Sequence, residues 1–222
     1  MMQSLSFDNA RKAMVESQIR ANKVIDDAVI DAFSSIPREH FVPKTMRDIA
    51  YIDEDLSLSG GRYVIEPMVM ARLIQAADLK PSSSVLVVGT GSGYGAAILS
   101  KIVSSVIAID SRAAMVQKAE QNLEKLEIGN VAVIQAKLQD GYLEESPYDA
   151  IFIEGAIECV PENLVTQLGP KGVIAAVWRP AGSHIGSASL WSQNAGDVTR
   201  RDLFNAQVPV LDEFKAKPSF VF

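Results

Sequence analysis

The sequence predicts an α/β fold: a doubly wound, mostly parallel sheet with an antiparallel edge and a cap of helices at the N-terminal end. Three observations lead to this prediction. Short apolar runs alternate with amphipathic segments after Pro81. These runs are apolar almost throughout, which is typical of parallel strands covered on both faces. The first third of the chain shows helical spacing of its apolar residues instead.

The N-terminal third predicts helices on either side of an irregular stretch. The second helix should end at Ile36, because the residue before Pro37 disfavours helical backbone. Residues 37–66 have no regular period, and Gly60-Gly61 marks a turn within them. We expect residues 1–80 to form the cap. The predicted helices of this part are 8–20, 26–35 and 67–79.

The rest of the chain predicts alternating strands and helices. The expected strands are 85–88, 105–110, 131–135, 150–153 and 173–178. The expected helices are 94–102, 113–126 and about 161–168. Beyond Arg179, the runs Ser-Leu-Trp, Gln-Val-Pro-Val-Leu and Ser-Phe-Val-Phe predict further strands, antiparallel at one edge of the sheet. No repeat or Ser/Pro-rich linker interrupts the chain, so we expect one domain over 1–222, with the sheet in 81–222.

Composition excludes several classes of protein. The net charge of −6 argues against a general nucleic-acid binder, which needs a basic footprint. A single cysteine, Cys159, excludes an intramolecular disulfide. No run approaches the roughly 18 apolar residues of a membrane helix, and the N-terminal segment has no apolar signal-peptide core. We therefore expect a cytoplasmic protein. His40 and His184 do not stand at ligand spacing with Cys159, so no metal site is predicted.

The most informative motif is a strand that runs into three alternate glycines and then into a helix. Val85–Val88 is followed directly by Gly89, Gly91 and Gly93. Glycine suits this place because the turn is tight and a ligand must approach the backbone closely. The helix that follows offers free N–H groups and the positive end of its dipole. The candidate ligand-binding residues of this loop are Gly89, Thr90, Gly91, Ser92 and Gly93.

A carboxylate follows at the distance expected for binding a ribose. Asp110 ends the next predicted strand, 21 residues after Gly89. From there it can accept hydrogen bonds from ribose hydroxyls. Alternatively, Asp110 caps the helix that begins near Arg112, a role that Ser111 could share. The loop and the acid together favour an adenosine-type ligand, and Ser111 joins the candidate site.

Two adenosine-type cofactors fit this pattern. Gly91, Gly93 and Ala96 satisfy a loose G-x-G-x-x-A pattern, which leaves a nicotinamide dinucleotide open. The G-x-G-x-G arrangement that begins at the strand end is the form found in methyltransferases. The late antiparallel edge also agrees with that class, so S-adenosylmethionine is the favoured cofactor.

Several motifs resemble the protein-L-isoaspartate O-methyltransferase family. The resemblance runs from about Met14 to the last parallel strand. It implies a seven-stranded class I methyltransferase fold, S-adenosylmethionine as cofactor, and cytosolic repair of isoaspartyl damage in a protein or peptide substrate. The matching stretches are Met14–Ile19, Pro37–Pro43, Ala50-Tyr51, Gly89–Tyr94, Pro147–Ile151 and Pro161.

On the cofactor side, the chain departs from the pattern of this family twice. The family places an acid two residues before the first glycine, where this chain has Val87. An Asp-Gly pair usually follows the third strand near the adenine, and the equivalent residues are Lys137-Leu138. A shifted alignment would use Asp140-Gly141, but the spacing to the next motif favours Lys137-Leu138. The resemblance therefore puts Leu138 at the cofactor.

The acceptor side departs as well. The family has a Thr-Ile-Ser-Gln-Pro-like segment whose serine faces the acceptor, and Ile65 stands at that serine position here. Glu66 and Glu154 would add negative charge that repels an anionic acceptor, and Arg62 could offset it. A carboxylate acceptor is already ionised near neutral pH and needs no general base, so no catalytic residue is assigned. The acceptor-side candidates are Arg62, Ile65, Glu66 and Glu154.

The sequence therefore supports three hypotheses about function. The first is methylation of a carboxylate on damaged protein, as the resemblance implies. The second is a protein of the same fold that methylates another acceptor. The third is a non-catalytic member that binds a nucleoside ligand or a protein partner. The sequence does not give the oligomeric state.

Overall fold

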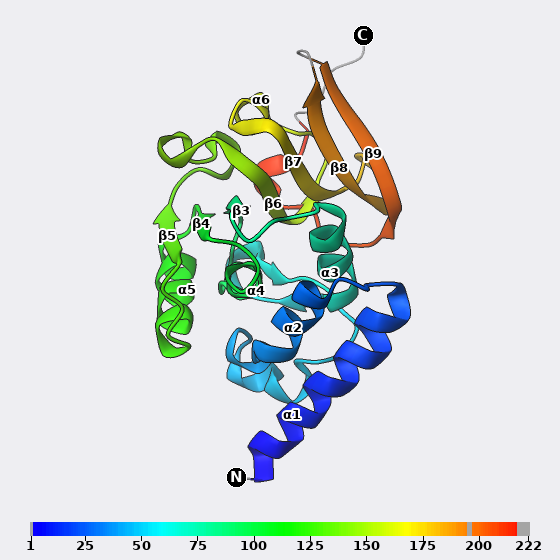
Figure 1. Cartoon of the computed structure of the whole chain (residues 1–222), viewed down its shortest axis with the longest axis vertical. Coiled ribbons are helices and arrows are strands. Elements are labelled where there is room, and N and C mark those ends of the chain that lie inside the picture. The colour runs from blue at the N-terminus through cyan, green and yellow to red at the C-terminus, as the bar shows by residue number, and fades with distance from the viewer. Residues whose placement is uncertain (1, 195–196, 217–222) are drawn as a thin grey trace.

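A computed structural model describes residues 2–194 and 197–216. Its main sheet has seven strands in the order β5-β4-β3-β6-β7-β8-β9, and a second, two-stranded sheet pairs β1 with β2 (Figure 1). Strands β5, β4, β3, β6 and β7 are parallel, and β8 and β9 are antiparallel to their neighbours. The parallel sheet and its antiparallel edge are therefore as predicted. The strands are β1 Leu56–Ser57, β2 Tyr63–Val64, β3 Ser84–Val88, β4 Ser105–Asp110, β5 Val131–Gln135, β6 Tyr148–Ile157, β7 Leu168–Trp178, β8 Gly186–Asn194 and β9 Asp197–Ala206.

The helices agree with the predicted ones in position but less well in length. The first α-helix ends at Met14 and continues as a π-helical and then a 3₁₀ turn to Asn22. The helix expected over about 161–168 is only one turn long, because β7 already begins at Leu168. The α-helices are α1 Met2–Met14, α2 Asp27–Ser35, α3 Pro67–Ala76, α4 Tyr94–Ser100, α5 Ala113–Lys125 and α6 Glu162–Val165.

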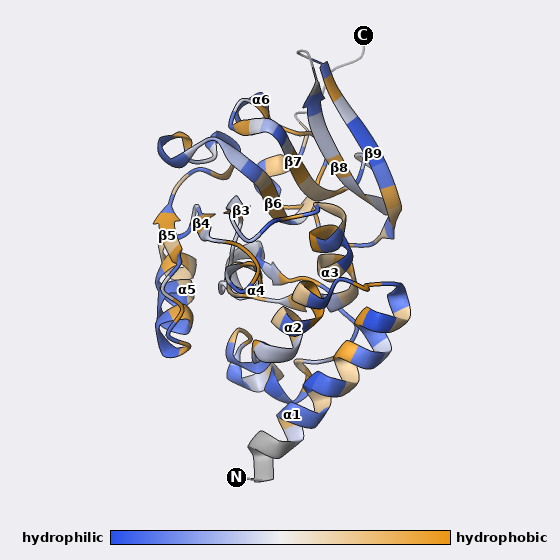
Figure 2. Ribbon diagram, viewed as in Figure 1, coloured by the Kyte–Doolittle hydropathy of each residue, from blue (hydrophilic) through white to orange (hydrophobic). Residues whose placement is uncertain are grey.

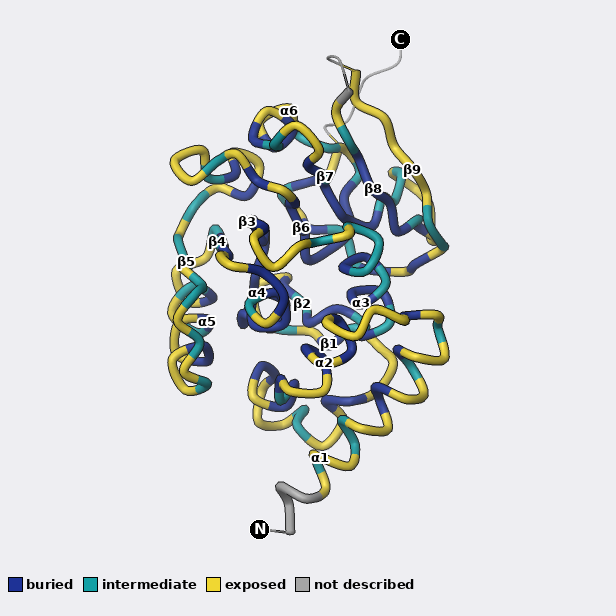
Figure 3. Tube along the Cα trace, viewed as in Figure 1, coloured by how far each residue is buried: buried dark blue, intermediate teal, exposed yellow. Residues whose placement is uncertain are grey.

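The two faces of the sheet are covered differently. Val85 and Val87 of β3 point into a large cluster of buried side chains that also includes α2, α3 and α4. Leu86 and Val88 point the other way, into a smaller cluster closed by α6 and by Leu211 of the C-terminal segment. Alternate side chains of a strand face opposite sides of the sheet. Because both faces are covered, both sets of side chains in β3 are buried (Figure 3). In Figure 2, α1 and α5 carry hydrophilic and hydrophobic residues in alternation, as expected of helices that pack with one face against the core.

The antiparallel edge was only partly predicted. The Ser-Leu-Trp run lies in β8, as expected, whereas β9 was missed because residues 197–202 are exposed and carry no apolar alternation. The prediction of a strand for Gln-Val-Pro-Val-Leu was wrong: of these residues only Val210 makes a β-bridge, to Ala156 at the end of β6. The Ser-Phe-Val-Phe run lies outside the described residues.

The stretch 37–66 is irregular, as predicted, but it contains the small β1–β2 hairpin. Gly60 and Gly61 form its turn with φ angles of 71° and 69°. The Leu58 amide donates to the Arg62 carbonyl at 2.7 Å and closes the turn. Arg62 thereby stands at the carboxyl ends of the central strands. Among the residues that the structure describes, none of the helices is long and apolar enough to cross a membrane.

Candidate functional site

The glycine loop leaves β3 with the backbone geometry that its sequence predicts. Gly89, Gly91 and Gly93 all have left-handed φ angles, of 77°, 53° and 90°. An L side chain would be strained at each of them. The Gly89 and Thr90 amides both donate to the Ile109 carbonyl, at 2.9 and 3.1 Å, which ties the loop to the end of β4. The loop is therefore a rigid turn at the carboxyl edge of the sheet.

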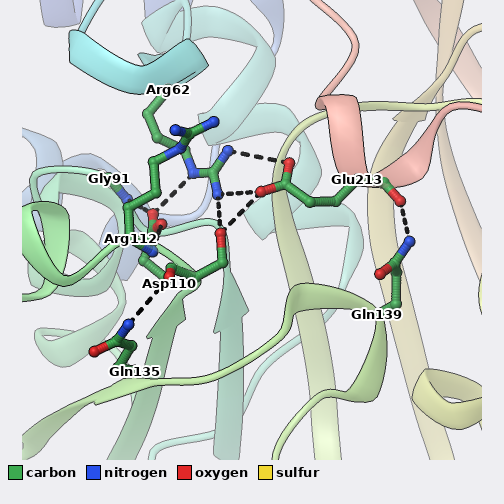
Figure 4. Close-up of polar contacts among 8 residues, drawn as sticks. Arg62, Gly91, Asp110, Arg112, Gln135, Gln139 and Glu213 are labelled. Atoms are coloured by element: carbon green, nitrogen blue, oxygen red, sulfur yellow. Dashed lines mark hydrogen bonds and ion pairs between the residues drawn. The ribbon is translucent and has the colours of Figure 1, made fainter.

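Asp110 lies at the end of β4 beside this loop, but protein groups already use its carboxylate. Its side chain is fully buried. Oδ2 accepts from the Arg62 Nε at 2.9 Å and from the Gly91 amide at 3.0 Å, and Oδ1 accepts from the Arg112 amide at 3.0 Å (Figure 4). The bond to the Arg112 amide closes a local turn before α5 and is not a helix cap, because Arg112 is itself the N-cap residue of α5 and no side chain caps that helix in the described part of the chain. The role of Asp110 as a ribose ligand remains a prediction.

Arg62 links Asp110 to the C-terminal segment. Its Nη2 donates to Oε1 of Glu213 at 2.7 Å and to the Ser111 hydroxyl at 2.9 Å, and Ser111 in turn donates to Glu213 at 2.9 Å. Burial alone raises the pKa of the Glu213 carboxyl, but the bonds from Arg62 and Ser111 outweigh it and hold that pKa at about 2. The Gln139 side-chain amide donates to the backbone carbonyl of Glu213 (Figure 4). Every charge in this network has an opposite partner.

Apolar side chains fill the space over the first glycine. A Cβ placed on Gly89 would lie 3.2 Å from Cδ1 of Leu211 and 3.6 Å from Cδ1 of Leu138. Both leucines are fully buried. Leu138, predicted to contact the cofactor, thus lies close to the glycine loop, and Leu211 of the C-terminal segment lies opposite it.

Among the acceptor-side candidates, Glu66 belongs to a separate acidic group with Asp53 and Asp55. Ile65 is buried, and Glu66 follows it at the start of α3. The Glu66 amide donates to Asp55 Oδ1 at 2.8 Å. Burial, together with the nearby charges of Asp53 and Asp55, raises the pKa of the Glu66 carboxyl to about 7. Burial likewise raises the pKa of Asp55 to about 6. This group holds several carboxylates in a partly desolvated place.

Arg62 and Glu154 have other surroundings than Glu66, and their acceptor-side roles remain predictions. Arg62 forms ion pairs with Asp110 and Glu213. Its charge is therefore paired at the cofactor loop and not with Glu66. Glu154 is buried against the first turn of α4: a Cβ on Gly95 would collide with its Oε1 and with Met70. Burial raises the pKa of Glu154 well above its ordinary value. Desolvation therefore favours the neutral form of this buried side chain.

One hollow lies between the cap and α5. It has a volume of about 490 Å³ and combines an apolar floor with lysine and arginine side chains. Ser92 of the glycine loop lines it, whereas the loop glycines and Asp110 do not. Its lining includes Phe41, Lys44, Arg47, Leu58, Met115 and Lys118.

Sequence reasoning missed three residues of the site: Gln139, Leu211 and Glu213. Arg62 and Glu213 are 151 residues apart. The run that contains Leu211 was predicted as a strand of the sheet edge. No local pattern marks a glutamate as the partner of a distant arginine, so only the folded chain could reveal this contact.

A sequence model of the protein-L-isoaspartate(D-aspartate) O-methyltransferase family matches residues 9–197. The chain belongs to this family. It is 38% identical over 158 residues to protein-L-isoaspartate O-methyltransferase 2 of Pelobacter propionicus, covering 71% of this chain and 70% of that protein. It is 35% identical over 198 residues to the enzyme of Roseiflexus castenholzii, covering 89% of each.

Solved structures agree on the fold. A protein-L-isoaspartate O-methyltransferase structure superposes with a TM-score of 0.78 at 25% identity, over 90% of this chain and 65% of the other. A second structure, described as a putative family member from Plasmodium falciparum in complex with S-adenosyl-L-homocysteine, has a TM-score of 0.75 at 22% identity and shows the fold alone. The predicted family and class I fold, and with the family its enzyme class and cofactor, are confirmed.

The family implies S-adenosylmethionine, and the residues present can be tested against it. The glycine loop fits, because its backbone is approachable and the buried hydroxyls of Thr90 and Ser92 have no hydrogen-bond partner in the described part of the chain. The rest of the edge does not fit in this arrangement of side chains. Asp110 is fully buried and accepts three bonds from protein groups, and Leu138 and Leu211 fill the space over Gly89. The edge is closed by the chain itself.

Proposed function

We propose that this chain catalyses the reaction of its family: S-adenosylmethionine-dependent methylation of a carboxylate on a damaged protein or peptide. The observation that carries the proposal is a family match over residues 9–197 that includes the left-handed glycine loop and the acid at the end of the next strand. S-adenosylmethionine supplies the methyl group. Gly89–Gly93, Asp110 and Ser111 are the residues proposed to hold it.

The reaction needs alignment more than acid–base chemistry. The acceptor carboxylate is ionised near neutral pH, so no residue has to remove a proton from it. The protein contributes by orienting the two reactants and by excluding water. Ile65 offers the acceptor no hydrogen bond, and Glu66 adds like charge when ionised. We therefore expect slow turnover of an isoaspartyl substrate.

Two further features belong to the same proposal. Residues 1–222 act as one domain, since one buried cluster joins the N-terminal helices to the sheet. The protein works in the cytoplasm, where its exposed free Cys159 would stay reduced.

Transfer of a labelled methyl group to an isoaspartyl peptide, with the aspartyl peptide as control, tests this function. We expect transfer to the isoaspartyl peptide only. The double variant Ile65→Ser/Glu66→Gln should raise the rate by about 10²–10³, the range associated with one oriented polar contact. Transfer to the aspartyl peptide would count against the proposal. So would the absence of transfer to the isoaspartyl peptide by both the unaltered chain and the double variant at saturating cofactor.

Binding of S-adenosylhomocysteine by calorimetry tests the cofactor site separately. Asp110→Asn should weaken binding by about 1.5–3 kcal/mol, the usual contribution of a charged hydrogen bond. Unchanged affinity in a folded variant would mean that Asp110 serves only the turn before α5.

A further inference from the structure

The carboxyl edge of the sheet at Gly89–Gly93 and Asp110, here named the cofactor edge, is closed by two parts of this chain that lie far apart in the sequence. Arg62 comes from the turn before β2, and the segment Pro209–Phe214 follows the last strand. We infer that these two parts form a latch over the cofactor edge, and that cofactor binds only after the latch opens. This inference rests on the proposed function, because it concerns entry to that same site.

Backbone hydrogen bonds hold the segment in place. The Ala156 amide donates to the Pro209 carbonyl at 2.8 Å, and the Leu211 amide donates to the Ala156 carbonyl at 3.0 Å. These two bonds continue the sheet by a single bridge beside the end of β6. They direct the Leu211 side chain over Gly89 and also over Gly155, where an added Cβ would lie only 2.5 Å from Cγ of Leu211.

Charge closes the other half of the edge. Glu213 holds the Arg62 guanidinium by two contacts, of 2.7 and 3.2 Å, while Nε of the same guanidinium occupies Asp110. A ribose can reach the fully buried Asp110 carboxylate only if a neighbouring group moves. Arg62 is the group that can move, because the other two donors to this carboxylate are the backbone amides of Gly91 and Arg112. Arg62 and an adenosine ligand therefore compete for one carboxylate.

The latch has one face from which it can be released. The Glu213 side chain is 20% exposed, whereas the side chains of Arg62 and Asp110 are 1% and 0% exposed. Its backbone sits on the short 3₁₀ turn Asp212–Phe214, not in a strand. When a closed state predominates, the apparent affinity for a ligand equals the affinity of the open state multiplied by the fraction of molecules that are open. Weakening the contact of Glu213 should raise that fraction.

The test compares S-adenosylhomocysteine binding by the full chain and by Glu213→Gln, measured by titration calorimetry. The glutamine keeps the shape and removes the charge that holds Arg62. Asp212→Asn is a matched control, because this carboxylate lies on the same turn, is 68% exposed and pairs with Lys215 instead. We expect Glu213→Gln to bind at least about tenfold more tightly than the unaltered chain, and Asp212→Asn to match the unaltered chain within about twofold.

Amide hydrogen exchange gives a second readout, which does not depend on a variant that folds well. Adding S-adenosylhomocysteine to the unaltered chain should speed exchange at the Leu211 amide, because opening breaks its bond to Ala156. Equal affinity in Glu213→Gln and the unaltered chain, with Leu211 equally or better protected in the complex, would overturn the latch while leaving the proposed function intact. Absence of binding by all three folded proteins would overturn both.

Discussion

The cofactor edge and the acidic group at the start of α3 treat charge in opposite ways. At the edge, the buried Arg62 lies between Asp110 and Glu213, so each charge has an opposite partner and the pKa of Glu213 falls to about 2. In the acidic group, Glu66 lies near Asp53 and Asp55, and its pKa rises to about 7. One region is closed by pairing, whereas in the other the carboxylates repel one another and the nearby charge of Arg38 offsets that repulsion only in part.

The two regions should therefore respond differently to the loss of a charge. A paired, buried network is costly to break from one side, because the remaining charge stays buried without a partner. A cluster of like charges is costly to keep ionised, so removing one of them helps the fold. Loss of charge should therefore destabilise the first region and stabilise the second.

The largest effect is expected from Arg62→Leu. It leaves the Asp110 carboxylate buried without its cationic partner, which should lower the free energy of unfolding by about 3–5 kcal/mol. Urea unfolding followed by circular dichroism measures this change. Arg20→Ala is the control, since its pair with Glu16 is exposed and should contribute no more than about 0.5 kcal/mol. Equal losses in both variants would show that the edge network is no different from a surface pair.

A smaller and opposite effect is expected from Glu66→Gln. The folded-state pKa of Glu66 is raised to about 7 from about 4.3 in the unfolded chain, so the folded state binds the proton more tightly between these values. This group therefore makes stability fall as pH rises from about 4 to about 7. The variant should be more stable than the unaltered chain by about 1 kcal/mol at pH 8, after allowing for solvent screening, and equal to it near pH 4.

Thermal melts from pH 4 to pH 8 measure that difference. Glu120→Gln, an exposed position on α5, is the control. If the advantage of Glu66→Gln were the same at both ends of the range, ionisation of Glu66 would not be its cause.

Glu213 should give the reverse pH dependence. Its folded-state pKa of about 2 lies below the unfolded value of about 4.3, so its contribution is present above about pH 4.3 and is lost as pH falls toward 2. As the pH is lowered from 5 to 2.5, the free energy of unfolding should therefore fall less steeply for Glu213→Gln than for the unaltered chain. Parallel curves would mean that Arg62 does not hold this carboxylate in solution.

The smallest effect is expected from Ser111→Ala. The hydroxyl joins Arg62 to Glu213, and its removal should cost about 0.5–1 kcal/mol. Ser17→Ala is the control, because that hydroxyl bonds only to a carbonyl of its own exposed helix. A loss at Ser111 no larger than at Ser17 would mean that Arg62 and Glu213 hold each other without the hydroxyl.

Local patterns in the sequence determined most of the fold and the position of the cofactor loop. Apolar strands, helical periods and the alternate glycines act between near neighbours along the chain, so the parallel sheet and the left-handed turn at Gly89–Gly93 could be predicted. The same reasoning failed at β9, whose exposed residues show no period, and at Gln207–Leu211, whose apolar run was taken for a strand.

Only the tertiary structure decided whether that loop stands open. Asp110 could be recognised as a carboxylate at the right place, but its use depends on Arg62, 48 residues earlier, and on Glu213 at the other end of the chain. Such contacts form between segments that leave no trace in each other's local pattern. The local sequence pattern was thus enough to locate the cofactor loop. The closure of the edge depends on the distant C-terminal segment packing onto that loop, because a buried charge needs an opposite charge beside it and only packing brings one there.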